Sequence, residues 1–160
     1  MPRNDLTLRP AVRRDVAEVL ALYRQPAMDR ETLAPADAEA LFDRIQRYPD
    51  YQVLVAVEPA PTAADGDAAP ARIVGTYLLL IMDKLSHLGT PTAVVDDVVV
   101  APDRQGGGIG SAMMRDAMAR ARARGCGKLT LSSNLSRERA HRFYEKLGFT
   151  QHGLSFQVTL

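Results

Sequence analysis

A run of glycines between Val98 and Ser111 has the composition of an anion-binding loop. The segment reads Val-Val-Val-Ala-Pro-Asp-Arg-Gln-Gly-Gly-Gly-Ile-Gly-Ser, and its β-branched start is typical of the end of a strand. Residues 111–124 contain no glycine or proline, which favours a helix. A helix N-terminus presents unpaired N–H groups to an anion, and glycine lets the backbone approach that anion closely. The order strand, glycine loop, helix therefore predicts a pyrophosphate site; a glycine-rich turn without a ligand is the alternative.

Two common phosphate-binding motifs do not fit this loop. A P-loop requires a lysine after its last glycine, and no lysine lies in or near the segment. The dinucleotide fingerprint requires a final glycine, where this chain has Ser111 or Met113, depending on which glycine begins the motif. An unrelated nucleotide-binding domain is therefore the weakest interpretation.

Asp96 and Asp97 are adjacent carboxylates in an otherwise apolar segment. A carboxylate can take a proton from an amine, directly or through water, or bind an ammonium group. Because side chains alternate between the two faces of a strand, we expect only one of the pair to face a cleft. A carboxylate is a weak base at neutral pH unless burial raises its pKa, so the sequence does not assign the general base.

The elements that must position these residues alternate between strands and helices. Apolar alternation and apolar runs predict strands over 5–9, 51–58, 72–82, 92–100, 128–132 and 155–160. Apolar residues at helical spacing predict helices over 13–24, 36–48, 111–124 and 136–147. Segment 59–71 is rich in Pro, Ala and Asp and predicts an exposed hairpin loop. The order β-α-α-β-β-β-α-β-α-β indicates one α/β domain over residues 1–160 with a mixed sheet.

Length and composition favour a globular protein without a nucleic-acid or membrane partner. A chain of 160 residues that is 46% hydrophobic can bury a core, and its net charge of +1 gives no bias towards nucleic acid or membrane. The single cysteine, Cys126, excludes an internal disulfide and fits a reducing compartment. No apolar run approaches the roughly 20 residues of a membrane span. We therefore expect a cytoplasmic protein.

Two segments resemble the signatures of one superfamily. Residues 105–110, Gln-Gly-Gly-Gly-Ile-Gly, resemble the Gln/Arg-x-x-Gly-x-Gly/Ala signature of the GNAT superfamily of acetyl-CoA-dependent N-acetyltransferases. Residues 140–149, Ala-His-Arg-Phe-Tyr-Glu-Lys-Leu-Gly-Phe, resemble its second signature, Ala-x-x-Phe-Tyr-x-x-x-Gly-Phe. The order of elements also matches, so the resemblance covers nearly the whole chain. It implies the GNAT fold, a mixed six- to seven-stranded twisted sheet flanked by four helices.

The resemblance also implies acetyl-CoA as co-substrate and no metal. Acetyl-CoA would lie beside the strand that ends at Val100, with its thioester carbonyl near the N–H of Val98 and its pyrophosphate on the glycine loop. Tyr144 would donate a proton to the departing thiolate. Arg137 replaces an asparagine of many relatives, and Asn134 would substitute for it; arginines 137, 139 and 142 either meet coenzyme A phosphates or form a solvated face. The implied cofactor contacts are Val98, Val99, Val100, Gln105, Gly106, Gly107, Gly108, Ile109, Gly110, Ser111, Asn134, Arg139 and Tyr144.

The segment Lys84-Leu85-Ser86-His87, followed by the acidic pair, is similar to the glucosamine-phosphate N-acetyltransferase branch of the superfamily. The resemblance implies a small-molecule primary amine as acceptor and a homodimer, with catalytic candidates Tyr144, Asp96 and Asp97 and acceptor contacts Lys84, His87, Asp96 and Asp97. That branch holds the substrate phosphate with a basic residue near the chain end, whereas residues 155–160 here contain none. The alternatives are acetylation of a protein or peptide amine, and an acyl-CoA sensor without catalysis.

Overall fold

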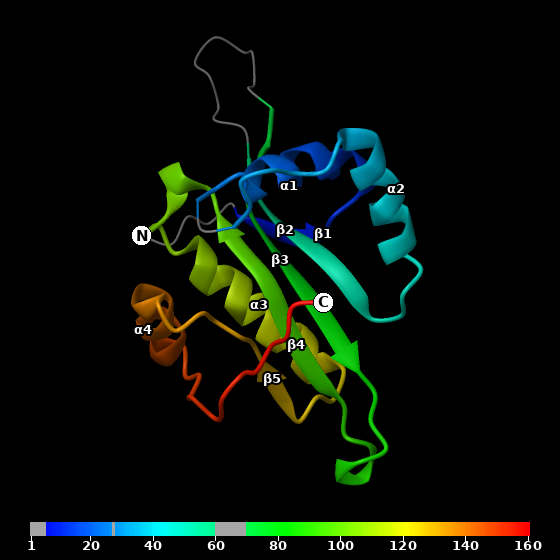
Figure 1. The fold of residues 1–160 in the computed structure, drawn as a ribbon, viewed down its shortest axis with the longest axis vertical. Coiled ribbons are helices and arrows are strands. Elements are labelled where there is room, and N and C mark those ends of the chain that lie inside the picture. Colours follow the sequence, from blue (N-terminus) through cyan, green and yellow to red (C-terminus); the bar gives the residue numbers. More distant parts are fainter. Residues whose placement is uncertain (1–5, 27, 60–69) are drawn as a thin grey trace.

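A five-stranded sheet forms the centre of the molecule, with helices on both faces (Figure 1). The computed structural model describes residues 6–26, 28–59 and 70–160. Within them the strands lie in the order β1-β2-β3-β4-β5, with antiparallel pairing from β1 to β4 and parallel pairing of β4 with β5. Their bounds are β1 Thr7–Pro10, β2 Tyr51–Glu58, β3 Arg72–Met82, β4 Thr92–Val100 and β5 Lys128–Thr130.

The helices lie where their apolar spacing predicts them, with ends shifted by one to three residues. They are α1 Val16–Tyr23, α2 Pro35–Ile45, α3 Ile109–Ala123 and α4 Glu138–Lys146, and short 3-10 turns span Arg13–Asp15, His87–Gly89 and Pro102–Arg104. The predicted bounds of β2, β3 and β4 agree with the structure at both ends. These three strands carry long, nearly uninterrupted apolar runs, which leave little freedom in placing their ends.

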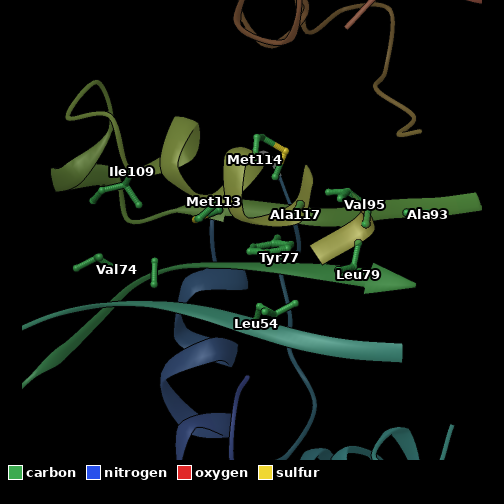
Figure 2. Close-up of a cluster of buried hydrophobic side chains, with 12 residues drawn as sticks. Leu54, Val74, Tyr77, Leu79, Ala93, Val95, Ile109, Met113, Met114 and Ala117 are labelled. Carbon is green, nitrogen blue, oxygen red and sulfur yellow. The ribbon is translucent and has the colours of Figure 1, made fainter. Parts of the chain in front are cut away.

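The core consists of two clusters, one on each face of the sheet. On one face Leu54, Val74 and Tyr77 lie under α3, which contributes Met113 and Ala117 (Figure 2). On the other face, residues of β2, β3 and β4 contact α1 and α2; the buried members include Val16, Val19, Phe42, Val53, Val55, Ile73 and Val99. The sheet is therefore covered on both sides, and β4 is fixed between the two clusters.

The last predicted strand, over residues 155–160, is wrong. Residues 151–160 form neither strand nor helix, and the sheet of the described residues has five strands, not six or seven. The side chains at 154, 156, 158 and 160 are 75–111% exposed. Alternating apolar residues form a strand only where a sheet edge pairs with them, and no described residue does so. The predicted hairpin loop falls largely on residues 60–69, outside the described residues, and no helix among those described is long and apolar enough to cross a membrane.

Gly75 in β3 permits the close approach of α3 to the sheet. A Cβ atom built at this position would lie 2.6 Å from the Met113 sulfur and 3.2 Å from the Val99 carbonyl oxygen. We expect Gly75→Ala to lower the free energy of unfolding by about 1–3 kcal/mol, because a well-packed core resists an added methyl group. Thermal denaturation measures this, with Gly153→Ala as control because no atom lies within 4 Å of its added Cβ. Equal melting temperatures for the two variants would show that the core relaxes around the methyl group.

Candidate active site

A bulge in β4 places the acidic pair. Thr76 of β3 lies opposite Val99 and Leu78 lies opposite Asp96, so one residue of β3 faces two residues of β4. Asp97 adopts a left-handed backbone conformation with φ of 48°, which is rare for a residue other than glycine. Val95 and Val98 both contact the cluster under α3, although an uninterrupted strand would place them on opposite faces.

The bulge corrects the expectation that alternation separates Asp96 from Asp97. Both carboxylates are near enough to Tyr51 to raise the pKa of its hydroxyl, to which burial contributes most. The Asp96 carboxylate also accepts a hydrogen bond from the backbone N–H of Asp97, at 2.9 Å. The extra residue of the bulge therefore brings both carboxylates into one region.

Asp97 lies in surroundings that favour its protonated form. Burial raises the pKa of its carboxyl group, and the negative charges of Asp96 and Asp29 raise it further. A carboxylate with a raised pKa is a stronger base than an exposed one, which suits proton transfer from an amine. These surroundings make Asp97 a candidate for the base, a role that stays a prediction.

Two residues around Asp97 were not predicted from the sequence. Tyr23, at the end of α1, has a raised hydroxyl pKa, caused first by burial and then by the charge of Asp97. Asp29 lies in the segment between α1 and α2, for which the sequence predicts neither a helix nor a strand. Its charge acts on both Tyr23 and Asp97. A cluster of charged residues directly after α1 was the available signal, but only the fold brings it to β4.

The edge of β4 that faces β5 is unpaired next to the bulge. β5 pairs with β4 only from Thr92 to Val94, so in the described part of the chain no strand continues along Val95–Val100 on that side. The backbone groups of this edge are therefore available to an amide-bearing ligand that lies along the strand as an additional strand would. Val98, one of the residues expected to contact acetyl-CoA, lies within this open edge.

The glycine loop follows the open edge and leads into α3. Gly106 and Gly108 have positive φ angles of 81° and 87°, and no atom lies within 4 Å of a Cβ built on either. Gly108 is the N-cap of α3, and no side chain caps the first N–H groups of that helix. Gly110 serves packing instead, because its Cβ would lie 3.3 Å from the ring of Phe143 in α4. The loop thus combines open space with unpaired donors, which suits a pyrophosphate.

Tyr144 lies on α4 and packs against the buried cluster under α3. Its ring makes edge contacts with Phe143 and Phe149, with centroids 5.1 and 5.6 Å away. Burial raises the pKa of its hydroxyl, Arg137 opposes this rise, and the charge of Asp96 adds to it. Among the described residues the hydroxyl makes no hydrogen bond, so it can serve a ligand. Tyr144 and Asp96, from separate elements, therefore lie within electrostatic reach of each other.

The turn between β5 and α4, together with α4 itself, contains some residues that order the local structure and others that are free to contact a ligand. The Asn134 side-chain oxygen accepts hydrogen bonds from the backbone N–H and the hydroxyl of Ser136, at 2.9 and 2.8 Å, and so orders the turn before α4. Ser133, which the sequence analysis did not name, has the one buried side-chain oxygen or nitrogen without a partner among the described residues. Arg139 is exposed, whereas Arg142 pairs with Glu138 at 3.5 Å.

The structure does not bring Lys84 and His87 to the acidic pair. They lie in the connection between β3 and β4, beyond the N-terminal end of β4 (Figure 1). Thr92 and Asp96 alone are separated by four residues of extended chain, or about 13 Å. A role of these two side chains in acceptor binding stays a prediction.

The open edge and the glycine loop together fit a coenzyme A thioester. The edge matches its amide-rich arm, and the loop matches its pyrophosphate. No group of three or more His, Cys, Asp or Glu side chains that could hold a metal occurs among the described residues.

Comparisons with known proteins agree with the class of protein that this fold and site define. Residues 16–149 match the Acetyltransferase (GNAT) family, and the chain belongs to that family. It is 38% identical over 89 residues to a glucosamine 6-phosphate N-acetyltransferase of Trypanosoma brucei brucei, a match that covers 56% of this chain and 58% of the relative. It is 30% identical over 123 residues to a probable glucosamine 6-phosphate N-acetyltransferase 2 of Oryza sativa subsp. japonica, covering 77% and 64%. These matches span less than two thirds of either curated relative.

Solved structures show the same fold over almost the whole chain. A crystal structure of a Trypanosoma brucei acetyltransferase is 29% identical, with a TM-score of 0.78 and coverage of 98% of this chain and 100% of that one. A putative acetyltransferase from Agrobacterium tumefaciens is also 29% identical, with a TM-score of 0.81 and coverage of 96% and 99%. The expected GNAT fold is therefore confirmed, with one correction to the strand count.

Proposed function

We propose that this protein transfers an acetyl group from acetyl-CoA to a primary amine of a small molecule, in a complex that holds both substrates. The observation that carries the proposal is the open edge of β4, which joins the bulge of Asp97 to the glycine loop before α3. One continuous segment thus offers a thioester site, an amine site and a pyrophosphate site. The family and the glucosamine 6-phosphate N-acetyltransferase relatives support it.

The main contribution to the rate is the positioning of amine and thioester next to each other. The backbone N–H near Val98 donates to the thioester carbonyl and stabilises the oxyanion that forms during attack. Asp97 takes the amine proton, directly or through water, and the negative charge of Asp96 and Asp29 attracts the ammonium form beforehand. Tyr144 donates its proton to the departing thiolate sulfur. The acetyl group moves to the amine, and coenzyme A leaves as the free thiol.

Release of coenzyme A thiol from acetyl-CoA tests the proposal. The acceptor panel contains glucosamine, glucosamine 6-phosphate, a polyamine, an aminoglycoside and short peptides. Turnover with a small amine supports a small-molecule N-acetyltransferase, and turnover with peptides alone supports a protein acetyltransferase. Acetyl-CoA binding without turnover of any acceptor contradicts the proposal and favours a sensor.

We also propose that two copies of the chain associate through the segment 154–160. Its apolar side chains alternate with polar ones, as in a strand with one apolar face. Nothing among the described residues covers that face, and the exposure of Phe156 is 89%. Large exposed apolar surfaces of this kind mark interfaces. A second copy offers the same unpaired segment, so two chains can cover each other.

Removal of residues 154–160 is expected to convert a dimer into a monomer. Light scattering coupled to size-exclusion chromatography measures the molar mass of the full chain and of the shortened chain at the same concentration. Phe156→Ser with Val158→Ser is a milder variant that keeps the chain length. A full-length chain that elutes as a monomer at high protein concentration would refute the association.

A further inference from the structure

A partly buried ion pair attaches the turn before the glycine loop to the C-terminal end of β2. The Arg104 guanidinium donates from Nε to the Glu58 carboxylate at 2.9 Å, across 46 positions of the chain. The side chain of Glu58 is 11% exposed and that of Arg104 is 33% exposed. Glu58 is the last residue of β2, and Arg104 is the last residue of the 3-10 turn Pro102–Arg104. Neither residue belongs to the signature at 105–110.

Arg104 also begins the glycine loop through its backbone. Its carbonyl oxygen accepts a hydrogen bond from the N–H of Gly107 at 3.3 Å, which closes a turn around Gln105 and Gly106. Gln105 has φ of −64° and ψ of 146°, and Gly106 has φ of 81°, as in a type II β-turn. The side chain that bonds Glu58 and the carbonyl that closes the turn belong to one residue. The position of Arg104 therefore sets where the loop begins.

The other contacts of the 3-10 turn hold its start or are exposed. The N–H of Ala101, just before the turn, donates to a carbonyl oxygen of β3 at 2.8 Å. A second ion pair joins Arg72 of β3 to Asp103, but both side chains are about half exposed, so it contributes little. Asp103 also accepts a hydrogen bond from Arg104, which lies within the turn and does not tie it to the sheet. The end of the turn is thus held mainly by Glu58.

A loop with this many glycines binds an anion well only if something limits its freedom. Four of the five residues 106–110 are glycines, and glycine loses more conformational freedom than any other residue when it is ordered. No atom lies within 4 Å of a Cβ built at Gly106 or Gly108, so packing does not hold these positions. An attachment at the first residue of the loop reduces the ordering that a ligand must supply when it binds.

We propose that Glu58 is a positioning residue for coenzyme A: through Arg104 it holds the glycine loop in the conformation that receives the pyrophosphate. This inference rests on the proposed function, because it takes the loop as the pyrophosphate site of acetyl-CoA. The ion pair also directs the Arg104 cation to β2. Glu58 therefore acts on the affinity for the cofactor and not on the reacting atoms, which lie at the bulge of β4.

Coenzyme A and a thioester without a pyrophosphate together test the inference. The variants are Glu58→Ala, Glu58→Gln, which keeps an acceptor for the guanidinium, Arg104→Ala, and Glu58→Ala combined with Arg104→Ala. Glu39→Gln is the matched control, because it breaks an exposed ion pair with Arg13 on α2. Titration calorimetry measures the Kd of coenzyme A. Kinetics compare acetyl-CoA with S-acetylpantetheine, which keeps the thioester arm and lacks the pyrophosphate, and melting temperatures check the folding of every variant.

Glu58→Ala is expected to raise the Kd of coenzyme A about tenfold, the size of effect expected from a lost hydrogen bond between charged groups. The kcat/KM for acetyl-CoA should fall by the same factor, with Glu58→Gln intermediate. The kcat at saturating acetyl-CoA, and the kinetics with S-acetylpantetheine, should change less than twofold. The double variant should lose no more than Glu58→Ala alone, because each residue acts through the other.

Equal losses for acetyl-CoA and S-acetylpantetheine would overturn the inference, since the damage would then not concern the pyrophosphate. Losses that add in the double variant, or tighter binding by Glu58→Ala, would overturn it as well, because Arg104 would then bind the phosphate itself. An unchanged Kd in Glu58→Ala refutes the inference while the proposed function stands. A wild type that does not bind coenzyme A refutes both. If no amine is turned over, the Kd values of the single and double variants decide alone.

Discussion

Replacement of Tyr144 by phenylalanine is expected to lower kcat about 100-fold, with little change in acetyl-CoA binding. The loss is that of a general acid, whose contribution is about 10²–10⁴-fold. The pKa of the Tyr144 hydroxyl is raised, mainly by burial, so the group is protonated at neutral pH and able to donate. Single-turnover kinetics with acetyl-CoA measure the loss, and equilibrium titration with coenzyme A measures binding.

The matched control for Tyr144→Phe removes a hydroxyl that lies outside the candidate site. Tyr48→Phe deletes the same oxygen from a side chain that is 63% exposed. Phenylalanine keeps the ring contacts of Tyr144 with Phe143 and Phe149, so the melting temperature should change little. If Tyr144→Phe turns over as fast as Tyr48→Phe, the thiolate takes its proton from water and Tyr144 has no role in the chemistry.

Replacement of Asp97 by asparagine is expected to lower kcat/KM for the acceptor about 100-fold and at the same time to stabilise the fold. The loss of activity follows from removing the base. The gain in stability follows from linkage: burial raises the pKa of Asp97 above its ordinary 3.8, so the ionised carboxylate opposes folding at neutral pH. Asparagine removes that charge. Denaturation at pH 7 and acceptor kinetics on the same sample measure both effects.

The pH dependence of Asp97 gives a second check. The unfolded chain releases this proton near pH 3.8 and the folded chain at a higher pH. Between these values stability falls as pH rises, and wild-type kcat/KM falls as pH drops through the folded pKa. The asparagine variant should lack both changes, whereas Asp103→Asn, at an exposed ion pair with Arg72, should retain the activity profile. An activity profile of Asp97→Asn that matches the wild type would assign the base elsewhere.

Most of the sheet could be predicted because the residues of each strand form a recognisable apolar run. The bounds of β2, β3 and β4 follow from apolar runs, and glycines with positive φ mark the loop before α3. The second signature places α4 and Tyr144. In these cases the signal is local, so no knowledge of distant contacts is needed.

The rest depends on contacts between distant segments. The bulge at Asp97 arises from the register of β3 against β4, which a period-two pattern cannot reveal, and so the sequence wrongly separates the two carboxylates. Tyr23 and Asp29 come close to Asp97 only in the folded chain, because α1 packs against the sheet that contains β4. Residues 154–160 do not form the predicted strand, for a related reason. Their alternating pattern specifies an apolar face but not the neighbouring strand with which they would pair.

The bulge at Asp97 is not needed for the packing of the sheet, although it places the proposed catalytic carboxylate. Without residue 97, the register on either side of the bulge would join into one regular ladder, with Asp96 opposite Leu78 and Val99 opposite Thr76. Both buried clusters would keep their members of β4, since Val95 and Val98 would then alternate normally. A single extra residue in β4 is therefore enough to place a partly buried acid on this strand without disturbing the packing of either cluster. By the same reasoning, we expect deletion of residue 97 to leave a folded protein that lacks the proposed base.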